Sequence, residues 1–374
     1  MNILLATDSF KDALDAQSVC RAIARGILRA MPEAAIRSFP LADGGEGTAQ
    51  ILTEHSAGRS IECVVNDPLF RPVRATYGLS GDGKTAFIEM AQASGLQLLK
   101  PEERNPLHTT TYGTGELIAD ALRRGVSHIM LGIGGSATND GGMGMAAALG
   151  WQFFDPAGKL LEPVGRNLGK VHRMLGNPEF TVRVEVMCDV NNPLYGPEGA
   201  AQVYAPQKGA DAVAVAELDA GLAHFSDVLK AFSGTDIAGI PGAGAAGGLG
   251  AGALFFLNAR MRSGIDAVME YTGFEAALSG IDLIVTGEGK IDRQTSKGKL
   301  ISGITRRAAE RNLPVIAFCG AVEVADSEIR DMGLLAAFSI QTKPLQLAEA
   351  IAQTAAGLEQ TATQVFRVMA IYFP

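Results

Sequence analysis

The stretch His128-Ile129-Met130-Leu131-Gly132-Ile133-Gly134-Gly135-Ser136-Ala137-Thr138-Asn139-Asp140-Gly141-Gly142 decides the fold class. Its apolar start has the length of a buried strand, and the small residues Met143–Leu149 that follow it favour a helix. Glycines and short polar residues before a helix leave backbone amides that can face an anion. The stretch therefore predicts an α/β fold with a phosphate-binding loop, formed by Gly134, Gly135, Ser136, Thr138, Asn139, Asp140, Gly141 and Gly142.

The same construction, an apolar strand followed by a loop with carboxylates, recurs along the chain. The predicted strand at 2–7 runs into Asp8, Ser9 and Lys11, and the one at 183–188 runs into Asp189. Two further loops carry the same features, at Asp43 and at Gly287, Glu288, Gly289 and Asp292. In open α/β sheets the carboxyl ends of parallel strands are where ligands bind. Helix caps at Asp8 and Asp43, and an Asp-Asn turn closed by proline at Asp189, are the structural alternatives.

Alternating apolar runs and amphipathic segments predict mostly parallel sheets with crossover helices. Between Ile61 and Met90 the pattern changes, because strict alternation and a Gly-Asp-Gly turn at 81–83 indicate antiparallel strands and a hairpin. We therefore predict two α/β domains. The first is Rossmann-like and discontinuous, 1–64 plus 266–374, and the second is an insertion at 65–265 that contains the hairpin.

Two motif matches are misleading in their context. Residues 78–85 fit the P-loop pattern GxxxxGK[ST], but the segments on both sides alternate like hairpin strands, and a P-loop needs a helix after it. Residues 242–247 fit GxGxxG, but the segment before them is too short for the first strand of a dinucleotide-binding fold. Small residues that open a helix can still leave amides for an anion.

Composition excludes several classes of protein. The formal net charge is −8 and no basic run exists, so nucleic acid is not an expected partner. The four cysteines and five histidines show no metal-ligand spacing. The uncharged stretch 237–257 is rich in glycine, which favours a buried loop and helix over a membrane span. Without a recognisable signal segment, we expect a cytoplasmic protein.

Several anion-handling loops with nearby carboxylates suit phosphoryl transfer, in which the protein places a hydroxyl against a phosphate and neutralises charge. Lysine and amides neutralise charge, while carboxylates hold Mg²⁺ or accept the hydroxyl proton. Two alternatives stay open. One is an NAD-dependent dehydrogenase of a small hydroxy acid, with NAD at 242–247, and the other is a non-catalytic module that binds nucleotides or anions.

Five motifs in order resemble the bacterial glycerate kinase family, of the type that forms 2-phosphoglycerate. They are Asp8-Ser9-Phe10-Lys11, the loop 42–48, the loop 132–142, the segment 188–194 and Thr286-Gly287-Glu288-Gly289. The resemblance implies ATP and glycerate as substrates, Mg²⁺ as cofactor and an active site in the cleft between two domains. In this sequence Asp12 and Ala13 replace the glycine and serine that usually follow the family's lysine, and a proline expected near Ile301 is absent.

We assign candidate roles as follows. Lys11 stabilises charge on the transferred phosphoryl group, and Asp8, Asp43, Asp189 and Asp292 are further catalytic candidates. Asp189 and Asp292 are also the candidate Mg²⁺ ligands. The loop 134–142 and Gly287, Glu288 and Gly289 bind the nucleotide phosphates, while Ser9, Thr114 and Gly115 bind the hydroxy acid, whose carboxylate needs a helix start or an arginine.

Overall fold

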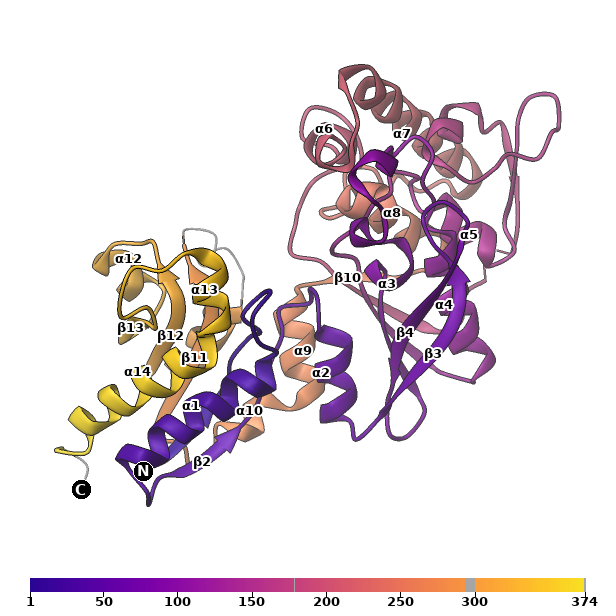
Figure 1. Ribbon diagram of the computed structural model, residues 1–374. Helices are drawn as coiled ribbons and strands as arrows, with labels where there is room; N and C mark the ends of the chain where they lie inside the picture. The colour runs from indigo at the N-terminus through magenta and orange to yellow at the C-terminus, as the bar shows by residue number, and fades with distance from the viewer. Residues whose placement is uncertain (178, 293–299, 373–374) are drawn as a thin grey trace. The chain divides into compact units, whose positions relative to one another are not determined.

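The structure, a computed structural model, describes residues 1–374 except 178, 293–299 and 373–374 (Figure 1). The chain divides into two compact units, Met1–Asp43 with Ile265–Pro374, and Gly44–Gly264. The predicted first boundary, after residue 64, lies later than this division. Strand β3 (Arg59–Asn66) pairs with β4 (Pro72–Leu79) along its whole length, which ties residues 59–66 to the second unit. The assignment of two domains stays a prediction.

The first unit is built on a parallel five-stranded sheet in the order β13-β12-β11-β1-β2. Its strands are β1 (Asn2–Leu5), β2 (Ala35–Ser38), β11 (Leu283–Ile291), β12 (Val315–Val322) and β13 (Ala336–Ser339). Its helices are α1 (Ala16–Ala30), α9 (Gly264–Thr272), α10 (Phe274–Ala277), α11 (Leu300–Ala309), α12 (Asp326–Asp331), α13 (Leu347–Ala352) and α14 (Thr354–Met369). The predicted parallel α/β architecture is confirmed.

Helices α1 and α14 bring the two ends of the chain together in this unit (Figure 1). The apolar stripe Val19, Ile23 and Ile27 of α1 is fully buried, as its four-residue spacing predicts. At Gly26 the two helices approach so closely that an added Cβ would lie 2.4 Å from the Glu359 carbonyl oxygen. A glycine is therefore required at this crossing.

The second unit is built on a six-stranded sheet in the order β10-β9-β6-β5-β4-β3, and a short pair, β7 with β8, lies apart from it. The remaining strands are β5 (Thr85–Glu89), β6 (His128–Gly132), β7 (Gln152–Phe154), β8 (Arg173–Leu175), β9 (Arg183–Met187) and β10 (Arg260–Arg262). The helices are α2 (Thr48–His55), α3 (Ala91–Ser94), α4 (Tyr112–Arg123), α5 (Met143–Ala148), α6 (Ala200–Tyr204), α7 (Ala212–Ser233) and α8 (Ala245–Phe256), with short 3₁₀ turns η1 (Leu96–Leu98), η2 (Pro101–Glu103), η3 (Gly165–Lys170) and η4 (Pro206–Lys208).

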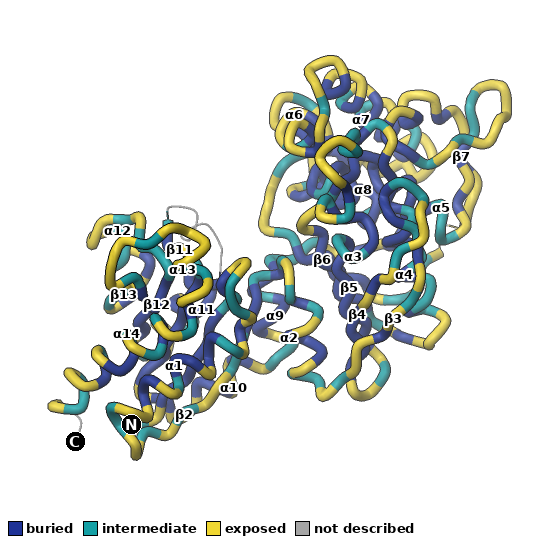
Figure 2. The backbone as a smooth tube through the Cα atoms, viewed as in Figure 1, coloured by how far each residue is buried: buried dark blue, intermediate teal, exposed yellow. Residues whose placement is uncertain are grey.

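Strands β5, β6, β9 and β10 are parallel, whereas β3 and β4 are antiparallel to their neighbours. The P-loop match at 78–85 is the β4–β5 hairpin, as predicted, because Ser80 N–H donates to the Thr85 carbonyl and closes the turn. The uncharged stretch at 237–257 forms a loop and the buried helix α8, which Figure 2 shows in dark blue. No described helix is long and apolar enough to cross a membrane.

Candidate active site

Asp8 lies just beyond the carboxyl end of β1 in the first unit, and its N–H donates to the Gly287 carbonyl of β11 at 3.0 Å. Burial, together with the neighbouring carboxylates Asp43 and Glu288, raises the pKa of its carboxyl to about 7, while the Ser9 N–H at 2.6 Å opposes the shift. The predicted residues Asp8, Asp43 and Glu288 therefore form one acidic cluster. Ser9 belongs to it through Asp8.

Lys11 is exposed and occupies a tight turn that Phe10 and Leu14 close by backbone hydrogen bonds. This turn lies against β11, because an added Cβ at Gly289 would lie 3.8 Å from the backbone nitrogen of Lys11. The next residue, Asp12, has φ of 62°, a left-handed conformation that favours glycine but that aspartate tolerates. The substitution that departs from the family pattern is thus compatible with the turn.

The prediction of a glycine loop after residue 286 was wrong, because the strand continues through these residues. Gly287, Glu288 and Gly289 continue β11 and pair in parallel register with β12. Gly287 allows the strands to approach, since an added Cβ there would lie 2.4 Å from the Phe318 carbonyl oxygen. Asp292 follows this strand, and its carboxylate lies 3.6 Å from the Lys290 ammonium. Residues 293–299, which come next in the chain, lie outside the described residues.

In the second unit, the loop after β6 has an exposed end and a buried end. Gly134 and Gly135 are exposed, and within the described residues their N–H groups donate to no protein acceptor. Residues 138–142 are buried beneath them. Only the exposed end, Gly134 to Ser136, can therefore present amides to a phosphate without a rearrangement.

Asp140 explains why the buried end is not a phosphate cradle. Its carboxylate accepts hydrogen bonds from the N–H and hydroxyl of Thr111 at 2.7 and 2.8 Å and from the N–H groups of Gly142 and Gly144, each at 3.1 Å. Burial raises the pKa of this carboxyl, and the four donors oppose that rise. Asp140 thus occupies amides at the start of α5, which the sequence assigns to phosphate, and at the start of α4, which the sequence assigns to the hydroxy acid.

Thr114 and Gly115 are packing residues in this structure. The Thr114 side chain is fully buried and shares a hydrogen bond of 2.8 Å with the Ser94 hydroxyl. An added Cβ at Gly115 would lie 2.4 Å from the Met145 carbonyl oxygen, so this glycine lets α4 and α5 approach. Since Asp140 already caps this end of α4, we leave both residues out of the site.

Lys208 was missed by the sequence analysis. It ends the short turn η4, is 1% exposed, and its Nζ donates to the Ser136 hydroxyl and to the Thr138 carbonyl, both at 2.7 Å. Burial lowers its pKa to about 7, and the charge of Asp140 opposes that shift. A lysine between Gln207 and Gly209 gives no sequence signal of burial, so only the structure could find it.

The predicted magnesium ligands, Asp189 and Asp292, are carboxylates, which are donors that Mg²⁺ prefers. Asp189 is exposed and accepts a hydrogen bond from the Gly264 N–H at 3.0 Å, while Asp292 follows β11. Among the described residues, no three acidic, histidine or cysteine side chains gather closely enough to hold a metal ion. Mg²⁺ takes only one or two protein carboxylates beside phosphates and water, so a site with one or two aspartates is sufficient.

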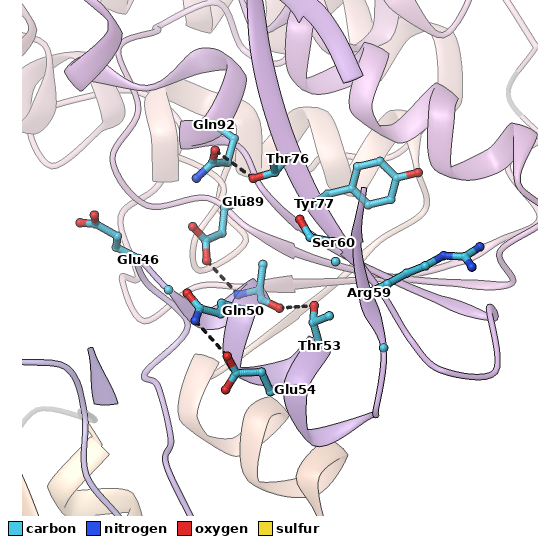
Figure 3. A pocket seen from close by; sticks show the side chains of 14 residues that line it. Glu46, Gln50, Thr53, Glu54, Arg59, Ser60, Thr76, Tyr77, Glu89 and Gln92 are labelled. Atoms are coloured by element: carbon cyan, nitrogen blue, oxygen red, sulfur yellow. Dashed lines mark hydrogen bonds between the residues drawn. The ribbon is translucent and has the colours of Figure 1, made fainter. Parts of the chain in front are cut away.

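A separate pocket of about 590 Å³ lies in the second unit, between α2 and strands β3, β4 and β5 (Figure 3). Glu89 points toward the start of α2 and accepts a hydrogen bond from the Ala49 N–H at 2.8 Å. Glu46 and Glu54 also line the pocket, whereas Arg59 is its only cationic lining residue. A pocket with this excess of carboxylates repels phosphate, so we do not assign it to the nucleotide.

Comparisons with known proteins agree with this arrangement of loops. A family model described as the glycerate kinase family matches residues 3–370. The chain belongs to the glycerate kinase family. A relative from Bacillus cereus named glycerate kinase is 45% identical, with 99% of this chain and 98% of the relative aligned. A relative from Escherichia coli K12 named glycerate 2-kinase is 42% identical over 94% of this chain and 93% of its own.

A solved structure, provisionally assigned as glycerate kinase 2 from Salmonella typhimurium LT2, has the same fold. Its TM-score is 0.90 at 42% identity, with 99% of this chain and 98% of that chain covered. Membership in the glycerate kinase family confirms the resemblance seen in the sequence, and the α/β fold with it. Neither the dehydrogenase nor the non-catalytic alternative gains support from these matches.

Proposed function

We propose that this protein transfers the γ-phosphoryl group of ATP to glycerate and releases ADP and 2-phosphoglycerate. The observation that carries the proposal is the match to the glycerate kinase family over residues 3–370. The relatives named glycerate kinase and glycerate 2-kinase align along nearly the whole chain, which supports the same activity here. The name of the second relative favours the 2-hydroxyl as the acceptor.

Asp8 is our candidate for the general base that takes the proton of the glycerate hydroxyl. A base works best when its pKa lies near the pH of the reaction, and the pKa of Asp8 is raised to about 7. Burial and the neighbouring Asp43 and Glu288 raise it because they disfavour a negative charge on Asp8. This environment makes Asp8 a better proton acceptor than an ordinary surface aspartate.

Lys11 and the exposed end of the loop 134–136 are our candidates for handling phosphate. Lys11 is exposed and follows Asp8 by three residues in the chain, and the amides of Gly134 and Gly135 are exposed in the other unit. Phosphoryl transfer depends on positioning and on neutralising charge, for which an ammonium and backbone amides are suited. We propose that both sets act on the same pair of substrates.

Asp189 and Asp292 stay our candidates for holding a magnesium ion that accompanies the nucleotide. When bound, such an ion neutralises charge on the phosphates and orients them. We also propose a cytoplasmic location, where ATP is available.

The purified protein should release ADP only when ATP, Mg²⁺ and glycerate are all present, and product NMR should place the phosphate ester on C2. A control with EDTA tests the need for a divalent ion. Absence of glycerate-dependent ADP release would exclude the proposed activity. An ester on C3 would contradict the proposed position of the phosphate but not the phosphorylation of glycerate.

A further inference from the structure

Lys208 is an unusual residue because a lysine is almost never fully buried without a charged partner in contact. Its side chain runs from η4 to the underside of the loop after β6, where its two hydrogen bonds end on Ser136 and Thr138. The nearest compensating charge, Asp140, is itself engaged by four donors. A buried ammonium with so little compensation is costly, which points to a role other than stabilising the fold.

Protonation of Lys208 fixes the direction of its hydrogen bond to Ser136. The protonated form, which prevails below the pKa of about 7, is an ammonium with three donors and no acceptor, so the Ser136 oxygen accepts from Lys208. The Ser136 hydrogen must then point to another acceptor, and within the described residues no protein atom accepts it. Ser136 is only partly buried and follows the exposed Gly134 and Gly135. Its hydroxyl is thus a donor beside two exposed amides.

Two further side chains of this loop, Thr138 and Asn139, carry buried polar groups. The Thr138 hydroxyl and both polar atoms of the Asn139 amide are fully buried, and they have no hydrogen-bond partner among the described residues. Buried polar atoms nearly always find a partner in the protein, in water or in a ligand. The partners of these atoms are therefore groups other than the described residues, such as ordered water or a ligand.

We propose that Lys208 is a positioning residue that holds the Ser136 hydroxyl as a hydrogen-bond donor to an oxyanion of a bound substrate. The inference rests on the proposed function for the identity of the substrates. The oxyanion is a phosphate of ATP or the carboxylate of the hydroxy acid, and the two sources share the same chemistry. Lys208 acts through Ser136 and does not touch the substrate.

The test compares Lys208→Met, Ser136→Ala, Ser136→Thr and the double variant Lys208→Met with Ser136→Ala. The assay runs at about pH 6.5, below the value of about 7 to which burial lowers the pKa of Lys208. Lys208→Met and Ser136→Ala should each raise the KM of the same substrate by about tenfold, the usual effect of losing a hydrogen bond to a charged group. A rise for ATP identifies the phosphate, and a rise for glycerate identifies the carboxylate.

Ser136→Thr keeps the hydroxyl and should keep the KM, whereas the double variant should be no worse than the worse single variant, because the two residues act as one unit. Lys230→Met, which removes an exposed lysine of the same unit, is the matched control and should change neither KM. The melting temperature of Lys208→Met should not fall, since the substitution removes a poorly compensated buried charge.

The inference is overturned if Ser136→Ala leaves both KM values unchanged, or if the effects of the two substitutions simply add. It is also overturned if Lys208→Met lowers the melting temperature without raising a KM, since that is a structural role alone. If the wild-type protein does not phosphorylate glycerate, the proposed function fails first. The same variants are then compared by calorimetry with ADP and with glycerate as separate probes.

Discussion

Asp8 shows how a single residue acquires its properties from its neighbours. In the sequence it is an aspartate after a strand, for which a helix cap is the structural alternative. In the structure it bonds to the N–H and the hydroxyl of Ser9, and burial with two other carboxylates raises its pKa to about 7. Since the next helix, α1, is capped by Asp15, Asp8 is not a helix cap.

The pKa of Asp8 predicts the pH dependence of the reaction. As pH rises through about 7, Asp8 loses its proton and becomes a base, so kcat/KM should rise along a limb centred there. Asp8→Asn should lower kcat/KM by roughly 10²–10⁴-fold and remove that limb. Asp12→Asn is the matched control, because Asp12 is exposed in the adjoining turn and asparagine accepts its positive φ.

The free energy of unfolding should fall as pH rises, whereas kcat/KM should rise. A carboxyl whose pKa is raised in the folded state holds a proton that the unfolded chain has already lost, so the free energy of unfolding falls as pH rises from about 4 to about 7. Asp8→Asn should flatten this dependence. An unchanged pH profile of kcat/KM in that variant would remove Asp8 from the base role.

Asp140 connects several secondary-structure elements, because it joins the loop after β6 to the starts of α4 and α5. Asparagine has one acceptor oxygen, so Asp140→Asn leaves buried donors of Thr111, Gly142 or Gly144 facing an amide group. We expect the free energy of unfolding to fall by roughly 2–4 kcal/mol. Urea unfolding monitored by circular dichroism measures it.

Asp236→Asn provides the comparison, because this carboxylate forms an exposed pair with Lys230. Exposed pairs contribute less than about 1 kcal/mol, so the effect should be small. If both variants lost the same stability, Asp140 would not be the anchor described above.

These elements also show what the sequence can and cannot predict. Strand, loop and helix at 128–149 follow from apolar runs and small residues, and the structure confirms them. The sequence does not predict which end of the loop is exposed. A carboxylate at position 140 can contact a ligand, or it can occupy the backbone amides that an anionic ligand would otherwise use. Gly287 and Gly289 suggested a loop, since the sequence does not reveal that β12 approaches them closely.

At the scale of the whole molecule, the candidate residues fall into two sets, one in each compact unit. Asp8, Lys11, Asp43 and Glu288 lie in the first unit, and the loop 134–136 with Asp189 lies in the second. The sequence order predicts this division only in outline, because the boundary depends on which sheet the strand at 59–66 joins. That both sets serve one reaction stays a prediction.

The most direct test of the central claim, that this chain transfers a phosphoryl group with Lys11 neutralising its charge, is kcat for glycerate-dependent ADP release in Lys11→Ala. We expect a fall of roughly 10²–10⁴-fold, as when a charge-stabilising group is removed elsewhere. Lys84→Ala, which removes an exposed lysine from the β4–β5 turn, should keep the wild-type value. A Lys11→Ala protein that folds and keeps a near wild-type kcat would contradict the account.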